Sequence, residues 1–281
     1  MKICEWLSNS KGADIDPLDA ELILLDVLRY TDRSQLTLHS DAELSPAAVR
    51  AANKMVKRRL KKEPLAFILG YRDFYGRRFS VVNNSVKTLI PRPESETIID
   101  LAKELQPGSI LDVGTGSGVL ALTLAAEMPN ALVFASDIFP EYYQVFSYNA
   151  QKLGLSTVNL SVQAYAPQSI PAPVMFTLSN LLDNINNHFD LIVANLPYVD
   201  GKWNWLDKEA LSYEPNSALF ADDDGLGLIK KLIVQVKQKS ASDYLILEAD
   251  PCQFGPVTDF AMGCGLTLLE ERGFQLLFRV N

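Results

Sequence analysis

The chain has 281 residues, of which 48% are hydrophobic and 21% are charged, and these are ordinary values for a globular protein rather than a disordered one. The formal net charge of −8 and the pI of about 4.9 argue against a surface built to bind a nucleic-acid backbone. No apolar run approaches the roughly 18 residues of a membrane helix, and the first nine residues contain no apolar signal core, so we expect a cytoplasmic protein that binds no membrane.

Cysteine and histidine are scarce in this sequence. The three cysteines, Cys4, Cys252 and Cys264, are far apart and odd in number, which favours reduced thiols over disulfides or a zinc cluster. The two histidines, His39 and His188, lie near no pattern that is typical of a catalytic triad or a metal site. We therefore expect chemistry without a metal and without a histidine base.

The first 65 residues or so carry helical patterns. Residues 17–29 place apolar side chains on one helix face, and Asp16 before Pro17 is typical of an N-cap followed by proline at the first helical position. A second helix begins in the same way at Ser45-Pro46, runs to about Lys62 and is strongly basic. This basic helix is either a docking surface for an acidic partner or a solvated helix face.

A change of pattern follows the helical region. Short apolar runs at 79–82 and 86–90 flank Asn83 and Asn84, and asparagine tolerates the positive φ angles of tight turns. This arrangement predicts a β-hairpin that links the helical region to the rest of the chain.

Helical and strand patterns alternate from about residue 91 onward. We expect helices at 94–105, 119–128, 141–153 and 227–239, and strands at 109–113, 131–136, 158–162, 189–194, 244–249, 266–269 and 274–280, with a proline-rich loop after the third strand. Such alternation predicts an α/β fold, with a mostly parallel sheet that is covered by helices on both faces.

A glycine-rich loop lies where the first of these strands ends and a helix begins. Its glycines follow the spacing G-x-G-x-G, whereas a dinucleotide loop has G-x-G-x-x-G and would need glycine where this chain has Val119. The observed spacing resembles the first motif of class I methyltransferases, which bind S-adenosylmethionine. The residues expected to bind the cofactor here are Asp112, Gly114, Thr115, Gly116, Ser117 and Gly118.

Asp137 follows the second strand, about 20 residues after this loop. A carboxylate in that position can accept hydrogen bonds from both hydroxyls of a ribose. Because NAD and S-adenosylmethionine both carry a ribose, Asp137 supports a nucleoside-containing cofactor without distinguishing the two.

The segment Asn195-Leu196-Pro197-Tyr198 ends another strand and resembles the Asn-Pro-Pro-Tyr motif of methyltransferases that act on nitrogens of planar groups. An amide nitrogen is a poor nucleophile, because its lone pair is delocalised. The Asn195 side-chain oxygen and the Leu196 carbonyl can each accept one N–H bond, which orients the nitrogen and stabilises developing positive charge. Pro197 stiffens the turn and Tyr198 offers a flat stacking face. Leucine at 196 keeps the carbonyl but loses the rigidity of the usual proline.

Three further stretches carry a resemblance to one family. They are Glu63–Gly70 continued by Asp73–Gly76, Leu89–Glu96 with its Pro-Arg-Pro-Glu core, and Tyr213–Leu226. Together with the two motifs above, and in this order, they resemble the HemK/PrmC family of release factor glutamine methyltransferases. The resemblance covers nearly the whole chain and implies methylation of the glutamine in the Gly-Gly-Gln loop of class I peptide chain release factors, with no direct nucleic-acid partner.

The resemblance also implies a division of the chain and a set of site residues. It implies an N-terminal helical substrate-docking domain at 1–75, a hairpin linker at 76–90 and a Rossmann-like, class I methyltransferase domain at 91–281. Asn195 to Tyr198, with Arg92 and Glu94, would bind the substrate, and Asn195 would also border the cofactor. The family's adenine-binding stretch is matched to Gln163-Ala164-Tyr165, where Tyr165 keeps the aromatic ring and Ala164 lacks the usual acidic group.

Three other functions are compatible with parts of this pattern. A nucleic-acid adenine methyltransferase could use the same Asn-x-Pro-Tyr geometry on a flipped base, but it would need a basic channel or a recognition domain. A cofactor-binding module without turnover is compatible with Leu196 and Ala164. A nicotinamide dehydrogenase is disfavoured, because the third dinucleotide glycine is absent.

Overall fold

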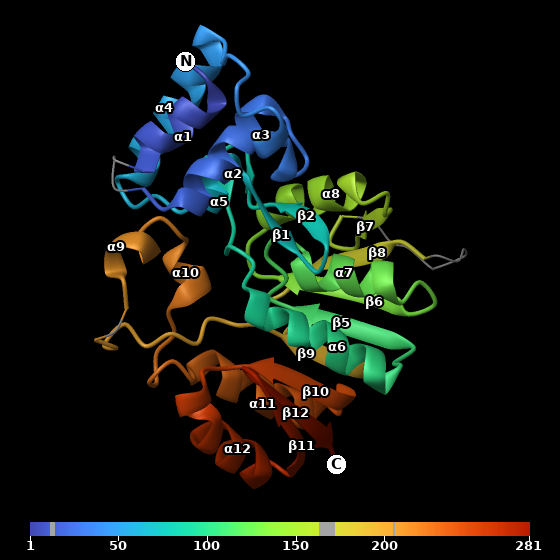
Figure 1. Ribbon diagram of the computed structural model, residues 1–281. Helices are drawn as coiled ribbons and strands as arrows, with labels where there is room; N and C mark the ends of the chain where they lie inside the picture. The colour runs from blue at the N-terminus through green and yellow to red at the C-terminus, as the bar shows by residue number, and fades with distance from the viewer. Residues whose placement is uncertain (12–14, 163–171, 205) are drawn as a thin grey trace. The chain divides into compact units, whose positions relative to one another are not determined.

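The computed structural model describes residues 1–11, 15–162, 172–204 and 206–281 (Figure 1). The chain divides into two compact units, one made of residues 1–71 with 207–213 and the other of residues 72–206 with 214–281. In the described ranges, no helix is both long enough and apolar enough to cross a membrane.

The first unit is helical, as predicted. Its helices are α1 (Ile3–Lys11), α2 (Pro17–Leu28), α3 (Ser34–Leu38), α4 (Pro46–Arg59), α5 (Leu65–Leu69) and α9 (Lys208–Leu211). Both predicted N-caps are confirmed, because the Asp16 side chain accepts from the Leu18 N–H at 2.7 Å and Ser45 accepts from the Ala48 N–H at 3.1 Å. The unit has its own apolar core, which includes the buried side chains of Ile3, Trp6, Ile23, Leu24 and Ala52.

The basic helix α4 uses part of its charge inside this unit. Arg58 pairs with Glu63 at 2.6 Å and Arg59 pairs with Asp19 at 2.5 Å. Helix α4 ends at Arg59, three residues before the predicted end at Lys62. The side chains of Lys54, Lys57 and Lys61 are exposed and make up the solvated part of the basic surface.

Two short hairpins lie before the main sheet. Strand β1 (Tyr71–Phe74) is hydrogen-bonded to β2 (Arg77–Ser80), and β3 (Val82–Asn83) pairs with β4 (Val86–Lys87). The predicted turn at Asn83-Asn84 is confirmed, with φ of 53° at Asn84. The predicted strand 79–82 was wrong in its pairing, because Phe79 and Ser80 belong to the earlier hairpin with β1.

The second unit is built on one eight-stranded sheet. Its strands are β5 (Ser109–Val113), β6 (Leu132–Asp137), β7 (Thr157–Asn159), β8 (Val174–Leu178), β9 (Phe189–Ala194), β10 (Ser242–Glu248), β11 (Leu266–Arg272) and β12 (Gln275–Val280). Their order is β11-β12-β10-β9-β5-β6-β8-β7, and only the pairings of β12 are antiparallel. The predicted mostly parallel α/β sheet is therefore confirmed.

Helices cover both faces of this sheet (Figure 1). The helical segments of the unit are η1 (Pro93–Ser95), α6 (Glu96–Leu105), α7 (Val119–Glu127), α8 (Tyr142–Lys152), α10 (Asn216–Leu219), α11 (Gly227–Lys239), η2 (Pro251–Gln253) and α12 (Phe254–Gly263). Side chains alternate along each strand, so Ile110 packs with α6, α7 and α8, whereas Leu111 and Val113 pack with α11 and α12.

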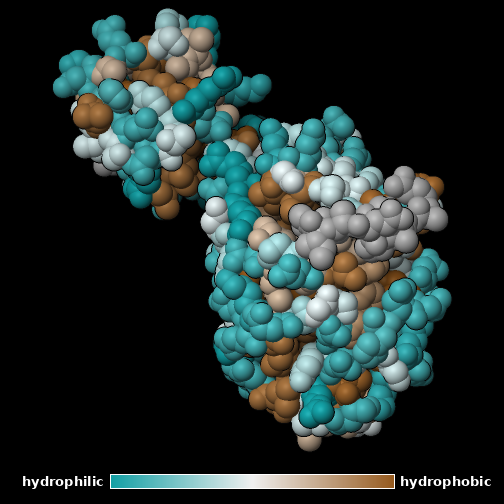
Figure 2. Space-filling model, turned by 90° about the vertical axis from the view of Figure 1, so that its right-hand side faces the viewer, coloured by the Kyte–Doolittle hydropathy of each residue, from teal (hydrophilic) through white to brown (hydrophobic). Residues whose placement is uncertain are grey.

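On the face shown in Figure 2, hydrophobic residues lie in separate patches among hydrophilic ones. Among the described residues, the large hydrophobic side chains with the greatest exposure are Val162 and Leu38, and they lie on different units. Single exposed apolar side chains of this kind are normal on a protein surface.

The strand register brings four chain segments to one edge of the sheet. Val113, the last residue of β5, is aligned with Ser136 of β6 and Ala194 of β9, so Gly114, Asp137 and Asn195 follow at the same level. Leu247 of β10 is aligned with Ala194, which sets Glu248 beside Asn195. From β5 the chain continues to β6, which lies on one side of β5 in the sheet, whereas β9 lies on the other side of β5. In open α/β sheets such a switch point at the carboxyl edge is where ligands bind.

Candidate functional site

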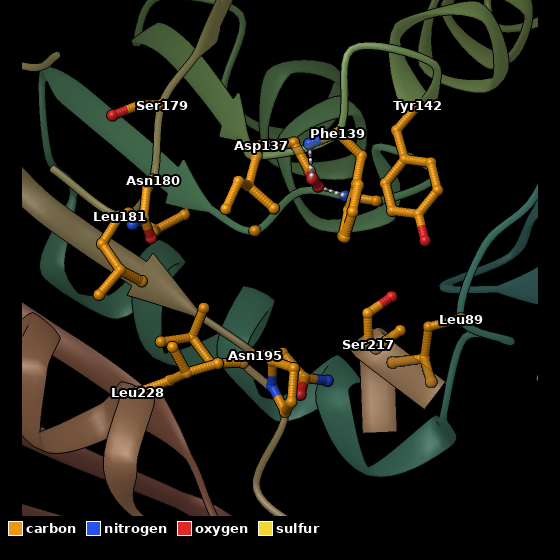
Figure 3. Close-up of a pocket in the computed structure, with 17 residues that line it drawn as sticks. Leu89, Asp137, Phe139, Tyr142, Ser179, Asn180, Leu181, Asn195, Ser217 and Leu228 are labelled. Atoms are coloured by element: carbon orange, nitrogen blue, oxygen red, sulfur yellow. Dashed lines mark hydrogen bonds between the residues drawn. The ribbon is translucent and has the colours of Figure 1, made fainter. Parts of the chain in front are cut away.

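A cavity of about 280 Å³ opens at this edge of the sheet (Figure 3). Its walls come from the ends of β5, β6, β8 and β9 and from helices α8, α10 and α11. The residues that line it include Leu89, Gly114, Gly116, Asp137, Phe139, Tyr142, Ser179, Asn180, Leu181, Asn195, Leu196, Pro197, Ser217 and Leu228. Mostly apolar walls with a few polar groups are typical of small-molecule sites.

A smaller pocket of about 40 Å³ adjoins the cavity. It shares Leu89, Gly114, Gly116 and Asn195 with the larger one. Its other polar residues are Arg92, Ser95, Asp112, Thr115 and Ser117. The predicted glycine-rich loop and the predicted Asn195 therefore border the same two spaces.

The three glycines of the glycine-rich loop all have positive φ angles, which strain other residues, and two of them also lie against neighbouring side chains. Gly114 has a φ of 77°, and an added Cβ would lie 3.0 Å from Cδ2 of Leu196. Gly118 has a φ of 82°, and an added Cβ would lie 2.5 Å from the Phe146 ring. The buried Asn149 side chain fixes the loop further, because its Nδ2 donates to the Ser117 carbonyl at 2.9 Å. The loop thus lies close to its neighbours and keeps the cavity open above it.

Asp112 is a buried carboxyl group at the base of the loop. Its Oδ2 accepts from the Thr115 hydroxyl at 2.7 Å and from the Ala121 N–H at 3.1 Å, near the start of α7. Its Oδ1 is buried and has no hydrogen-bond partner among the described residues. Burial raises the pKa of Asp112 from 3.8 to about 7. An unpartnered acceptor on a pocket wall fits a ligand that brings a positively charged donor, such as the ammonium group of an amino acid.

Asp137 lies on the wall of the larger cavity, as predicted. Its Oδ2 accepts from the Gly116 N–H at 2.9 Å and its Oδ1 from the Phe139 N–H at 3.0 Å (Figure 3). Each oxygen retains a second lone pair, so the carboxylate can also accept two hydroxyl donors. Burial raises the pKa of Asp137 to about 6, which leaves the group mostly ionised at pH 7.

Three residues of the segment Asn195–Tyr198 line the cavity, and the fourth does not. Asn195, Leu196 and Pro197 line the larger cavity, and Nδ2 of Asn195 donates to Oγ of Ser95 at 2.9 Å. Tyr198 is absent from the walls of both described pockets, and its hydroxyl donates to Glu248 Oε1 at 3.2 Å. The Leu196 side chain, at the position where the family usually has proline, is buried in the core beside the loop.

Glu248 is a second buried carboxyl group behind the motif. Burial raises its pKa, and hydrogen bonds from Ser95, Tyr198 and Gln275 oppose this rise. Burial and the adjacent Glu248 also raise the pKa of Tyr198, so its phenol stays protonated. The carboxyl group therefore ties three chain segments together behind Asn195.

The two predicted substrate residues before α6 differ in their positions. Arg92 lines the smaller pocket and pairs with the buried Glu214 at 2.6 Å, while the other oxygen of Glu214 accepts from the Ile90 N–H at 3.0 Å. The Glu94 side chain is exposed and lies on neither described pocket, although its carbonyl accepts from Gln275. Arg92 thus borders the site, and Glu94 contributes through its backbone.

Part of the cavity wall consists of residues that the sequence patterns did not identify. Ser179, Asn180 and Leu181 follow β8, at the same edge as Asp137. Strand β8 was missed, because its short apolar run lies in a stretch that we expected to be a loop. A polar Ser-Asn pair directly after the apolar run Val174–Leu178 was the available signal. The predicted adenine-binding stretch Gln163-Ala164-Tyr165 lies outside the described residues.

Tyr142 and Ser217 close another side of the cavity. They lie on α8 and α10, and both side chains line the cavity (Figure 3). Burial raises the pKa of Tyr142 to about 12, so this hydroxyl stays neutral and can only exchange hydrogen bonds. Among the described residues, no group of three or more His, Cys, Asp and Glu side chains is arranged to hold a metal ion.

Comparison with known families and curated proteins agrees with this geometry. Residues 7–70 match the model of the PrmC N-terminal domain, and residues 95–209 match the methyltransferase small domain. A release factor glutamine methyltransferase of Neisseria gonorrhoeae is 35% identical, over 88% of this chain and 84% of its own. A protein of the same name from Koribacter versatilis is 37% identical, over 78% of this chain and 73% of its own.

A solved structure shares the fold over nearly the whole length. The hMettl16 catalytic domain, determined in complex with the MAT2A 3'UTR hairpin 1, has a TM-score of 0.50 and 14% identity, and the match covers 91% of this chain and 89% of that one. This likeness concerns the fold alone. The sequence relationships, together with a glycine-rich loop, Asp137 and Asn195 around one cavity, show that this chain belongs to the release factor glutamine methyltransferase family.

Proposed function

We propose that this protein transfers a methyl group from S-adenosylmethionine to the side-chain amide nitrogen of the glutamine in the Gly-Gly-Gln loop of class I peptide chain release factors. The observation that carries the proposal is the alignment of Gly114, Asp137 and Asn195 at one strand edge, around a cavity of about 280 Å³. The 35% identity to a release factor glutamine methyltransferase over 84% of that relative supports the choice of substrate.

The cofactor fits the residues of the two pockets. Asp137 has two lone pairs available for the ribose hydroxyls, and Ile138, Phe139 and Leu181 give the same cavity apolar walls for the adenine. The unpartnered Oδ1 of Asp112 suits the ammonium end of the methionine part. When bound, S-adenosylmethionine supplies an electrophilic methyl group. We assign Gly114 to Gly118 to the floor beneath this ligand.

The substrate amide is held by the end of β9. The Asn195 Oδ1 and the Leu196 carbonyl each accept one N–H of the glutamine side chain, which orients the nitrogen lone pair and stabilises the positive charge that develops on it. Tyr198, held at Glu248, supports this turn from behind rather than from the described cavity wall. Residues Leu196 and Pro197, with apolar neighbours such as Leu228, exclude water from the reacting groups.

The division of labour along the chain is part of the proposal. Residues 1–75 dock the release factor, residues 76–90 form the linker and residues 91–281 carry out methyl transfer. The exposed Lys54, Lys57 and Lys61 form a basic surface that suits an acidic region of the partner. Because class I release factors act on ribosomes, we place the enzyme in the cytoplasm.

Incubation with labelled S-adenosylmethionine and a purified class I release factor tests the proposal. We expect label on the release factor with its native Gly-Gly-Gln loop and none when the loop glutamine is replaced by alanine. Equal labelling of both factors, or labelling of neither by an enzyme that binds the cofactor, would contradict it.

A further inference from the structure

The orientation of the Asn195 amide is set by a chain of buried hydrogen bonds. Nδ2 of Asn195 donates to Oγ of Ser95 at 2.9 Å, and Ser95 is only 2% exposed at the start of α6. Glu248, which is 1% exposed at the end of β10, also interacts with the Ser95 side chain. Three residues from three separate elements therefore form one continuous relay behind the cavity.

Glu248 is surrounded by donors. Besides Ser95, its Oε1 receives the Tyr198 hydroxyl at 3.2 Å, and its Oε2 receives Nε2 of Gln275 at 3.2 Å. The same Nε2 donates to the Glu94 carbonyl at 3.0 Å, which fixes the amide of Gln275 as a donor on this side. As a carboxylate, Glu248 accepts from all three neighbours, and these hydrogen bonds favour its ionised form against the opposing effect of burial on its pKa.

This arrangement gives the relay a direction. Nδ2 of Asn195 donates to the Ser95 oxygen, which leaves the single hydrogen of the Ser95 hydroxyl for the Glu248 carboxylate. The two ends of an asparagine amide have nearly the same shape, and only the hydrogen-bond partners decide which end points where. Asn195 therefore turns its NH₂ toward Ser95 and leaves Oδ1 for the cavity. In the hydrogen bonds of the described residues, this Oδ1 has no partner.

We propose that Glu248 and Ser95 act as positioning residues that make the site select a side-chain amide over a carboxylate, by holding the Asn195 oxygen toward the substrate. This inference rests on the proposed function. A glutamine side chain brings one N–H donor to this oxygen and the other to the Leu196 carbonyl, whereas a glutamate side chain brings only lone pairs, which repel both oxygens. A reversed Asn195 amide would present N–H groups and would favour the carboxylate instead.

Selectivity of this kind can be large. A site built to hydrogen-bond a substrate N–H rejects an analogue that lacks it by roughly 10⁴-fold to 10⁵-fold, because buried polar groups lose their partners. Loss of the relay leaves Asn195 free to turn and removes this penalty. The main effect is then on the choice between amide and carboxylate, and the cofactor should still bind.

Ser95→Ala and Glu248→Gln test the relay, with Ser242→Ala as the matched control. Ser242, the first residue of β10, is also a buried serine, but its hydroxyl has no hydrogen-bond partner in the described part of the chain. Each enzyme is assayed for methylation of a release factor with a Gly-Gly-Gln loop, for inhibition by the same factor with Gly-Gly-Glu, and for the Kd of S-adenosylmethionine. Wild type and Ser242→Ala should methylate the glutamine factor and be inhibited only weakly by the glutamate factor.

In Ser95→Ala and Glu248→Gln we expect kcat on the glutamine factor to fall by about 10-fold to 100-fold, as for a misplaced catalytic group. We also expect the ratio of the inhibition constant of the glutamate factor to the KM of the glutamine factor to fall at least about 10-fold. The Kd of S-adenosylmethionine should be unchanged. A preserved preference for glutamine in a variant that binds cofactor normally would overturn the relay. Failure of the wild type to methylate the glutamine factor would instead overturn the proposed function.

Discussion

Replacing Asp112 by asparagine removes a buried ionisable group. The effects of this group on the free energy of unfolding and on cofactor binding can then be measured separately. The folded protein holds Asp112 neutral up to a pKa of about 7, whereas the unfolded chain ionises it near 3.8. A raised pKa in the folded state means that stability is highest when the group is protonated and falls as pH rises through the folded pKa. The wild type should therefore lose stability between weakly acidic and alkaline pH.

The magnitude follows from the two pKa values. One pKa unit corresponds to 1.36 kcal/mol, and between about pH 5 and pH 9 the linkage relation gives a loss of roughly 2–3 kcal/mol through Asp112. Asparagine keeps an oxygen for the Thr115 hydroxyl and the Ala121 N–H, and it carries no charge. Its NH₂ takes the unpartnered Oδ1 position, at a cost of roughly 1–3 kcal/mol at every pH.

Urea unfolding of the wild type and Asp112→Asn at several pH values measures this difference. We expect the variant to be less stable than the wild type near pH 5 and to approach or exceed it near pH 9, since only the wild type loses stability through this group. In parallel, the variant should bind S-adenosylmethionine more weakly, because it no longer offers a negatively charged acceptor. Free energies of unfolding that run parallel for the two proteins across this range would refute the reasoning.

Two further changes probe the cofactor site. The Kd of S-adenosylmethionine should rise as pH falls through about 7 and then about 6, because protonation of Asp112 removes the charged acceptor for the ammonium group and protonation of Asp137 removes acceptors for the ribose. Asp137→Asn should weaken binding by roughly 10-fold to 100-fold and remove only the part of this pH dependence that lies near pH 6. A wild-type Kd that is flat down to pH 5 would contradict this. Gly118→Ala should destabilise the fold by roughly 1–3 kcal/mol, because its Cβ would meet the Phe146 ring at a positive φ, whereas Gly255→Ala on α12, where a Cβ meets nothing, should not; equal melting temperatures for the two variants would count against that argument.

The central strands and the site motifs could be predicted from the sequence because their signals are local. The bounds of β5, β9 and α11 agree with the predicted ranges, since apolar runs there are bordered by glycine, asparagine or charged residues. Gly114 and Asn195 lie next to such strands, and parallel strands bring their carboxyl ends to one edge. The proximity of the glycine-rich loop and Asn195 could therefore be predicted from the parallel arrangement of the two strands.

Other parts of the site depend on contacts between residues far apart in the chain. Helix α12 begins with Phe254-Gly255-Pro256 and buries only Val257 and Ala261, so its sequence carries no clear helical period. The relay of Glu248, Ser95 and Asn195 joins residues up to 153 positions apart, and no local pattern marks it. The role of Tyr198 likewise could not be read from its motif, because its hydroxyl partner lies on β10.

The most direct test of the account compares Asn195→Ala with the wild type in methylation of a class I release factor, with the cofactor Kd measured on the same preparations. Because Asn195 supplies an oxygen that holds the reacting nitrogen, we predict a fall in kcat of about 10²-fold to 10³-fold while S-adenosylmethionine binds within a few-fold of wild type. Mass spectrometry of the wild-type product should place a single methyl group on the loop glutamine. Undiminished methylation by Asn195→Ala, or a methyl group on any other residue, would contradict the account.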